Sequence, residues 1–365
     1  MDYMDYMERQ KIVFVKQTND GDEPSGVLSE AVRALAPDRV FILTDENTRR
    51  MCLPTFNKRY AHEAGQAEII TIAADDSHKT LESVSHVWSE LQRGGATRHS
   101  LLVCVGGGMV TDLGGFAAST FKRGMAFINI PTTLLAMVDA SVGGKTGFNF
   151  GGLKNEIGVF NNAATVVIDT RFLQTLDREN ILSGYAEMLK HGLLADSTML
   201  AQLLTFDVET PSLTALQQMV ADSVGVKQRI VTDDPTEQGL RKALNLGHTV
   251  GHAFEALALQ SGSPVLHGYA VAWGLVCELY LSAVKTGFPV DRMRQVVSFI
   301  VGHYGRMPVG CDDYPTLLEL MRHDKKNVAG VINFTLLSDV GDIRIDQHCT
   351  QQEIEAALDF YREGC

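Results

Sequence analysis

Short, mostly apolar runs alternate with amphipathic segments along the first half of the chain. Each run is followed by enough residues for a helix before the next run begins. The runs lie at residues 12–15, 40–43, 68–72, 101–105, 127–130 and 165–168. Strands that are buried on both faces appear as continuous apolar runs, so this alternation predicts a mostly parallel sheet with helices on both faces. Ligands of such sheets bind at the carboxyl ends of the strands.

Beyond about Phe172 the pattern changes to long amphipathic helices. Apolar positions recur there with helical spacing over residues 179–194, 213–231, 244–259, 269–284 and 292–303. Two short strands, at residues 331–337 and 342–345, and a last helix from Gln351 close the chain. We therefore predict an α/β domain over residues 1–172 and a mainly α-helical domain over residues 173–365. No linker rich in proline, serine or glycine separates them, so we expect the active site in the cleft between the domains.

The acidic balance of the chain limits its partners. The formal charge is −12, which argues against nucleic acid because its binding needs a basic face. An anionic substrate would therefore need a locally basic site. No run of ~18 or more apolar residues predicts a membrane span. The first ten residues are acidic and polar, unlike a signal peptide, so we expect a cytoplasmic location. Six cysteines without a Cys-x-x-Cys pair match neither a disulfide framework nor a zinc ribbon.

Polar residues and glycines stand where the predicted strands end. Glycines 106–108 follow the fourth run, and glycine lets backbone N–H groups approach an anion at the start of a helix. Thr132 and Thr133 follow the fifth run. Two successive units of strand, polar turn and helix are typical of a nucleotide site. Asp45 and Asn47 follow the second run, where an acidic residue either binds an adenosine ribose or caps the next helix.

Two familiar nucleotide motifs are excluded by single positions. Thr111 stands where the dinucleotide-binding fingerprint that begins at Gly106 requires its third glycine. The sequence GGKT at residues 143–146 resembles the end of a P-loop, but Asp139 occupies the position of the first P-loop glycine. The chain is therefore not a P-loop kinase.

A candidate metal site comes from the predicted helical domain. His248 and His252 are four residues apart and share a helical face, although paired helix histidines also cap or pack. Glu187 lies inside an otherwise apolar helix, where a carboxylate needs a cation or a proton, and His267 starts another helix. Two imidazoles, one carboxylate and an open position make a catalytic zinc site. Spacing alone selects His248 and His252 as the imidazoles, and the glycine before each would let a ligand approach.

A set of cations stands out in this acidic chain. Exposure to solvent explains any single lysine, but several cations around one anion would bind a phosphate firmly, since a unit-charge pair at ~4 Å contributes ~4 kcal/mol near a surface. Lys145 and Lys154 are expected in glycine-rich loops. The set is Arg123, Lys145, Lys154, Lys190, Lys227, Arg241, Lys325 and Lys326.

Several of these blocks together resemble the 3-dehydroquinate synthase family. They are the glycine turn with Asp112, Arg123-Gly124, PTTLL at residues 131–135, VDASVGGKT at residues 138–146 with Asn149, and Lys154-Asn155. The resemblance extends from Asp45 to Lys325-Lys326. The chain departs from the family at Met109 and Thr111 in the glycine turn, and at Asp76, where the family usually has Glu.

The resemblance implies a Rossmann-like NAD-binding domain, a helical metal- and substrate-binding domain, and a homodimer. It also implies conversion of 3-deoxy-D-arabino-heptulosonate 7-phosphate to 3-dehydroquinate and phosphate, in the shikimate pathway to chorismate. Transient oxidation by NAD, phosphate elimination, reduction and an intramolecular aldol closure make up that reaction. The implied metal is Zn²⁺ or Co²⁺ on Glu187, His248 and His267, with His252 facing the substrate instead of the metal.

The resemblance further assigns the remaining residues. Its NAD site comprises Asp45, Asn47, Asp76, Lys79, Gly106, Gly107, Gly108, Asp112, Thr132, Thr133, Lys145, Lys154, Phe172 and Thr175. Its substrate phosphate is bound by Lys145, Asn155, Asn245 and His252, with Arg123 from a partner subunit. Lys227 and Arg241 would bind the substrate carboxylate, and Asp139 would orient either Lys145 or the ring hydroxyls of the substrate. Lys190 and Lys326 complete the implied catalytic set.

Other functions share part of this pattern. An NAD- and metal-dependent polyol dehydrogenase would share the sheet, the helical domain and the metal ligands, but it would not need the set of cations. Another sugar phosphate cyclase is a second alternative. A metabolite-binding protein without activity is the third, and it is disfavoured because no residue of the motifs is missing.

Overall fold

The computed structural model describes residues 10–15, 26–60, 67–151, 153–322 and 331–364. The chain forms two compact units, Met1–Asp177 with Ser212–Val224 and Arg178–Pro211 with Gly225–Cys365. The predicted division between residues 172 and 173 did not include the segment Ser212–Val224, with which the chain returns to the first unit. Among the described residues, no helix combines the length and apolar character needed to cross a membrane.

The first unit is built on a six-stranded parallel sheet. Its strand order is β1-β8-β5-β4-β2-β3, and every neighbouring pair is parallel. The strands are β1 (Ile12–Phe14), β2 (Val40–Asp45), β3 (Glu68–Ile72), β4 (Leu101–Gly106), β5 (Ala126–Pro131) and β8 (Thr165–Ile168). The predicted α/β class is confirmed, because all six apolar runs form strands within two residues of their expected ends.

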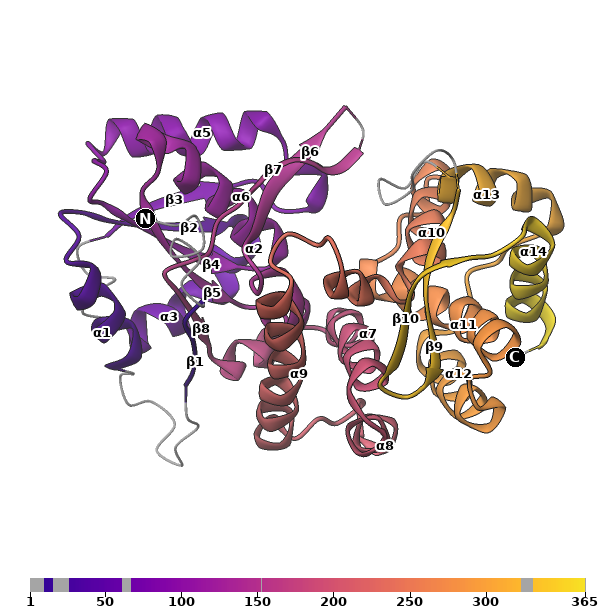
Figure 1. Cartoon of the computed structure of the whole chain (residues 1–365). Helices are drawn as coiled ribbons and strands as arrows, with labels where there is room; N and C mark the ends of the chain where they lie inside the picture. Colours follow the sequence, from indigo (N-terminus) through magenta and orange to yellow (C-terminus); the bar gives the residue numbers. More distant parts are fainter. Residues whose placement is uncertain (1–9, 16–25, 61–66, 152, 323–330, 365) are drawn as a thin grey trace. The chain divides into compact units, whose positions relative to one another are not determined.

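Helices cover both faces of this sheet. They are α1 (Gly26–Leu35), α2 (Glu46–Met51), α3 (Leu53–Arg59), α5 (Leu81–Arg93) and α6 (Gly108–Thr120). In Figure 1, α5 and α6 lie on one side of the sheet, and α1 and α3 lie on the other. In the sheet, β3 lies next to β2 on one side, whereas β5 lies next to β4 on the opposite side. These neighbouring strands therefore form a topological switch point, where ligands of doubly wound sheets bind.

A two-stranded hairpin corrects one sequence prediction. Lys145 and Lys154 were expected in loops, but they lie in antiparallel strands β6 (Lys145–Phe150) and β7 (Leu153–Phe160). Glycine occurs here because the strands approach closely: a Cβ on Gly147 would collide with the backbone of β7, and one on Gly158 with that of β6. The hairpin is attached through β6, which packs on α6.

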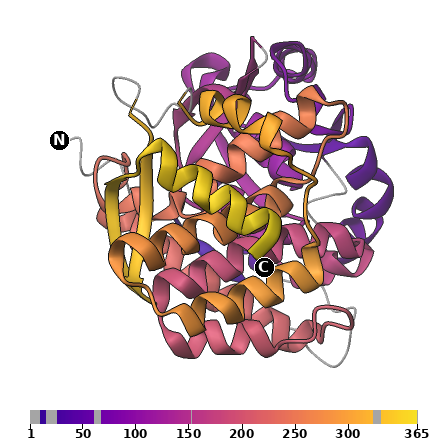
Figure 2. The same cartoon turned by 90° about the vertical axis from the view of Figure 1, so that its right-hand side faces the viewer.

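The second unit is mainly helical, as predicted. Its helices are α7 (Arg178–Ala195), α8 (Ser197–Thr205), the later part of α9 (Leu213–Asp233), α10 (His248–Gln260), α11 (His267–Thr286), α12 (Val290–Tyr304), α13 (Tyr314–Arg322) and α14 (Gln351–Asp359). An antiparallel pair, β9 (Asn333–Asp339) and β10 (Asp342–His348), completes it. Helix α11 is central, packing against α7, α10, α12, α14 and β9; Figure 2 shows α14 and the β9–β10 pair around this bundle.

Candidate metal and cofactor sites

Three side chains from three helices of the second unit converge at one point. Glu187 of α7 is fully buried. Its Oε1 lies 3.3 Å from Nε2 of His248, the first residue of α10, and 3.7 Å from Nε2 of His267, the first residue of α11. Carboxylate oxygen and imidazole nitrogen are the ligand types of a catalytic zinc site. We call these three residues the cluster.

The outer nitrogen of each imidazole is held by a hydrogen-bond acceptor. Nδ1 of His248 donates to Leu246 O at 3.1 Å, and Nδ1 of His267 donates to Glu255 Oε2 at 3.2 Å. Since a carbonyl and a carboxylate only accept, each Nδ1 carries the proton, and each neutral ring keeps its lone pair on Nε2. Both lone pairs then face the Glu187 carboxylate, an arrangement of acceptors that a cation stabilises.

The charges around the cluster favour ligand forms of its residues. Burial alone would raise the carboxyl pKa of Glu187, but the ion pair with Lys190 and the contacts with both histidines hold that pKa well below its usual range. Burial and the Lys190 ammonium lower the pKa of His248 to about 3. At neutral pH, Glu187 is therefore ionised and His248 is neutral.

His252 also lies near the cluster. Its ring centroid is 5.3 Å from that of His248 and 5.8 Å from that of His267. Nitrogen atoms of the three imidazoles lie within 4.8 Å of one another. The geometry therefore leaves both predicted ligand sets open.

Glycines allow α7, α10 and α11 to approach closely enough for the cluster to form. A Cβ on Gly268 of α11 would collide with Ser183 O of α7, and one on Gly274 would collide with the backbone of α10. Gly247 and Gly251 were expected to make room for a ligand, and this expectation is wrong. A Cβ on Gly247 would meet Leu275 at 2.8 Å, and one on Gly251 would meet Ala270 O at 2.9 Å, so both glycines face α11.

Three carboxylates around these residues were missed in the sequence. Glu255 contacts His267, Glu278 accepts the backbone N–H of Gly247 at 2.6 Å, and Glu237 accepts from Asn245 Nδ2 at 3.2 Å. A signal was present for Glu255 and Glu278, because each interrupts an apolar helical run in the same way as Glu187. Glu237 lies in a polar segment that gives no such signal.

Three cations of the predicted catalytic set are buried in the second unit. Lys190 is paired with Glu187, and Lys227 lies in α9. Arg241 is 1% exposed and donates from Nη1 to Pro235 O at 2.6 Å. Burying a cation is costly unless an anion pairs with it. Three buried cations in one unit of an acidic chain therefore indicate a site for anionic groups.

Predicted cofactor residues of the first unit form a polar network. Lys79 is 3% exposed, and its Nζ donates to Asp112 Oδ2 at 2.6 Å and also to Asn155 Oδ1. Asn155 was assigned to the substrate phosphate, whereas here it bonds to Lys79 and Asn149. The network connects the hairpin to the segment before α5 and to the second turn of α6.

Asp76 and Lys154 extend this network at the surface. Lys154 Nζ lies 3.2 Å from Asp76 Oδ2, and both side chains are about half exposed. Asn149 donates from Nδ2 to Asp76 O at 3.1 Å. The shorter Asp76 side chain, in place of the usual Glu of the family, therefore pairs with a predicted cofactor residue.

The glycine turn meets the segment after β5. A Cβ on Gly107 would approach Thr133 Cγ2 at 3.1 Å, and one on Gly108 would approach Ala140 at 3.2 Å. Gly107 is the N-cap of α6, and no side chain caps that helix. Because these glycines have no side chains, an anion can approach the backbone N–H groups at the N-terminus of α6. Thr132 binds this turn through its N–H, which donates to Gly106 O at 2.9 Å.

Other predicted cofactor residues have local structural roles. Asp45 caps α2, with Oδ1 accepting from Thr48 N at 2.7 Å. A carboxylate has further acceptor positions, so capping is compatible with ribose binding. Asn47 accepts from Arg50 at 3.3 Å. Phe172 is buried, and its carbonyl accepts from Thr175 Oγ1 at 3.1 Å.

The structure leaves several predicted assignments open. Asp139 lies in a single π-helical turn, Ala136–Ala140, and Lys145 is exposed at the start of β6. Arg123 is exposed and has positive φ, and within the described ranges no hydrogen bond or ion pair involves it. Lys325 and Lys326 lie outside the described residues. The predicted position of the active site between the domains stays a prediction.

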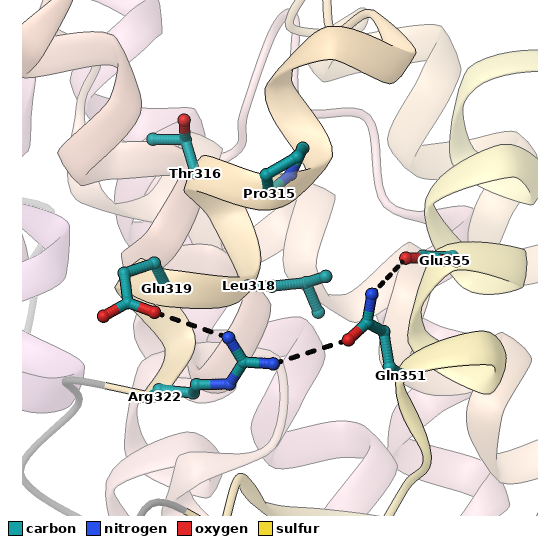
Figure 3. Close-up of a pocket in the computed structure, with 7 residues that line it drawn as sticks. All are labelled: Pro315, Thr316, Leu318, Glu319, Arg322, Gln351 and Glu355. Carbon is teal, nitrogen blue, oxygen red and sulfur yellow. Dashed lines mark hydrogen bonds and ion pairs between the residues drawn. The ribbon is translucent and has the colours of Figure 1, made fainter.

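The second unit also has a groove of about 540 Å³. It is lined by Pro315, Thr316, Leu318, Glu319, Arg322, Gln351 and Glu355. Figure 3 shows its polar groups bonded to one another, with Arg322 between Glu319 and Gln351. It contains no predicted site residue, so we do not assign the active site to it.

Comparisons with known proteins agree with the motifs. Residues 69–183 match the 3-dehydroquinate synthase N-terminal family, and residues 184–327 match the corresponding C-terminal family. A 3-dehydroquinate synthase of Parabacteroides distasonis is 51% identical over 358 residues, covering 98% of this chain and 99% of the relative.

Solved structures share the fold over the whole length. ValA, a 2-epi-5-epi-valiolone synthase from Streptomyces hygroscopicus subsp. jinggangensis with NAD⁺ and Zn²⁺ bound, is 25% identical with a TM-score of 0.80, covering 98% of this chain and 97% of that one. A 2-deoxy-scyllo-inosose synthase complexed with carbaglucose-6-phosphate, NAD⁺ and Co²⁺ is 22% identical with a TM-score of 0.78, covering 94% and 96%. On the matches of both halves and the 51% identity, this chain belongs to the 3-dehydroquinate synthase family.

Proposed function

We propose that this chain is a 3-dehydroquinate synthase, a phosphate-eliminating lyase that converts 3-deoxy-D-arabino-heptulosonate 7-phosphate to 3-dehydroquinate. The observation that carries the proposal is the cluster, in which a buried, ionised Glu187 faces the Nε2 atoms of His248 and His267. The relatives add support because the chain matches them over nearly its whole length. A polyol dehydrogenase is not favoured, since it does not explain the buried cations.

Glu187, His248 and His267 would hold the metal. The donor set fits Zn²⁺ or Co²⁺, because all three groups present lone pairs at one point and are oriented by hydrogen bonds or ion pairs on their far sides. Such an ion, when bound, acts as a Lewis acid toward substrate hydroxyls. Lys190 keeps Glu187 ionised, and Leu246 and Glu255 keep the two Nε2 atoms directed inward.

The first unit would hold NAD at the switch point between β2 and β4. The glycine turn, the uncapped N-terminus of α6 and the cap position of Asp45 all lie at these strand ends. Thr44 Oγ1 and Thr132 Oγ1 are buried without a hydrogen-bond partner among the described residues. Such atoms are expected where a bound polar ligand supplies the hydrogen bond. NAD, when bound, accepts a hydride from the substrate and returns it.

We assign the substrate to the remaining polar residues. Lys145, Asn155, Asn245 and His252 would bind the phosphate, and Lys227 with Arg241 would bind the carboxylate. Asp139 would orient Lys145. The cytoplasmic location of the protein is a separate proposal, which rests on the sequence alone. Because Arg241 and Lys227 are buried, an anion between them would be held with little competition from water.

A phosphate-release assay tests the proposed function. The purified chain with Zn²⁺, trace NAD and the heptulosonate phosphate should release one phosphate per substrate without accumulation of NADH, because the hydride is returned. The same chain without NAD is the control. Steady NADH formation from a simple polyol, with no phosphate release, would instead establish a dehydrogenase.

We also propose that β7 is the homodimer interface. All eight of its residues are exposed, and Leu153, Ile157 and Phe160 are 60%, 39% and 50% exposed. Only β6 pairs with it among the described strands, so its outer edge is a template for another strand. A second β7, antiparallel about a two-fold axis through Asn155, would place Lys154 opposite Glu156 of the partner subunit and Leu153 opposite Ile157 of the partner subunit.

Sedimentation equilibrium can test this interface. The wild-type chain should sediment as a dimer, and Ile157→Lys should sediment as a monomer because two lysines would face apolar side chains across the axis. Val284→Lys is the control, since Val284 is 58% exposed on α11. A dimeric Ile157→Lys variant would exclude β7. If Arg123 acts from the partner subunit, the monomer should also lose efficiency with substrate.

A further inference from the structure

Helices α10 and α11 exchange two largely buried carboxylates. Glu255 of α10 binds His267 of α11, and Glu278 of α11 binds the first turn of α10. We propose that Glu255 and Glu278 are positioning residues, each of which fixes the cluster histidine carried by the other helix. This inference rests on the metal site of the proposed function.

Glu278 supplies the cap that α10 itself lacks. It is fully buried, and its carboxylate accepts from Gly247 N at 2.6 Å and from Val250 N at 3.1 Å. Gly247, the N-cap of α10, has no side chain for this purpose and adopts φ 79°. A side chain there would also collide with Leu275. The cap therefore comes from Glu278 of α11. Its negative charge is favoured at the N-terminus of α10 by the dipole of that helix.

The capped turn determines where His248 points. His248 is the first residue of α10 and lies between the two residues whose N–H groups Glu278 binds. Its Nδ1 is tied to Leu246 O, directly before the same turn. A shift or fraying of this turn would move the imidazole relative to Glu187, which belongs to a different helix. Glu278 thus acts on the cluster through the backbone of this turn.

Glu255 has the complementary role for His267. The His267 side chain is 28% exposed, compared with 11% for His248, so surrounding atoms restrict its ring less. The Glu255 carboxylate, 3.2 Å from Nδ1, keeps the proton on that atom and directs Nε2 toward Glu187. Carboxylates in this position orient metal-binding histidines and increase their basicity.

Zinc affinity of metal-free protein, measured by competition with a chromophoric chelator, tests the inference without an activity assay. Glu255→Met should weaken binding ~10- to 100-fold, the usual effect of losing such a partner. Glu255→Gln should lose less, because its amide oxygen still accepts from Nδ1. Glu278→Gln should weaken binding ~10-fold, because one of the two backbone N–H groups would face an amide NH₂. Amide exchange of Val250 in the metal-free protein should also accelerate.

Glu353→Gln is the matched control. Glu353 completes the capping box of α14 by accepting from Thr350 N at 2.6 Å, and it also pairs with Lys285 in the last turn of α11, at the opposite end of that helix from His267. It should lower stability without changing zinc affinity. Glu255→Met and Glu278→Gln proteins that bind zinc within twofold of wild type would overturn the inference alone. So would an equal loss in Glu353→Gln, since affinity would then follow general stability. A wild-type chain that bound no zinc would overturn the metal site and this inference together.

Discussion

Replacing His267 with alanine should remove stoichiometric metal from the protein and reduce turnover on the order of a thousand-fold. The loss corresponds to several kcal/mol of charge stabilisation by a bound metal. In the structure, His267 Nε2 faces Glu187 Oε1 at 3.7 Å and its far side is held by Glu255. Elemental analysis after exhaustive dialysis, together with the phosphate-release assay, measures both effects.

His252→Ala separates the two candidate ligand sets. We expect this variant to keep its metal and to lose rate, because His252 would contact the substrate phosphate. His303→Ala, which removes a histidine paired with the surface residue Glu209, should keep both. If His252→Ala lost the metal and His267→Ala retained it, the assignment based on the i, i+4 spacing would be correct.

Arg241→Ala should lower kcat/KM for the heptulosonate phosphate by two to three orders of magnitude. Removing one member of a buried charge pair costs about 3–5 kcal/mol, and Arg241 is 1% exposed. Sedoheptulose 7-phosphate, which has no carboxylate, should be a poor substrate of the wild-type enzyme, because it would leave the buried guanidinium without its anion. The variant should therefore narrow the difference between the two substrates.

Loss of folding is distinguishable from loss of recognition in this experiment. Arg241 also donates to Pro235 O, so zinc content and the unfolding midpoint of the variant must be measured. Arg241→Lys keeps the charge and loses only the planar fork, so it should fold and recover part of the preference for the acid. If the wild-type enzyme had equal kcat/KM on both substrates, the proposal that Arg241 binds the substrate carboxylate would be wrong.

The strands of the sheet were predictable because their burial is local information. Each apolar run is long enough to cross the core, and burial on both faces leaves no polar position in the pattern. The hairpin was missed for the opposite reason. Only residues 146–148 of β6 are buried, on the strand that packs against α6, while every residue of β7 is exposed. Neither strand therefore has the pattern of a core strand. Its glycines suggested loops instead.

The sequence by itself identified the family and the residue types of the cluster. A carboxylate in an apolar helix, a pair of histidines on one predicted helical face and a histidine at a helix start are chemical signals that need no coordinates. The tertiary structure decided which groups meet. Glu187, His248 and His267 come together because Gly268 and Gly274 let α11 contact the backbones of α7 and α10. Such contacts depend on residues distant in the chain, and local periodicity carries no information about them.

Orientation was likewise decided only by the fold. The sequence could not show that Gly247 and Gly251 face α11, and it left open whether Asp45 caps the next helix or binds a ribose. Nor could it show that Glu255 and Glu278 fix the two histidines across the α10–α11 contact. Periodicity reports which side of a helix is apolar, whereas the partner of a buried polar group depends on how neighbouring helices are packed, and burial makes that partner obligatory.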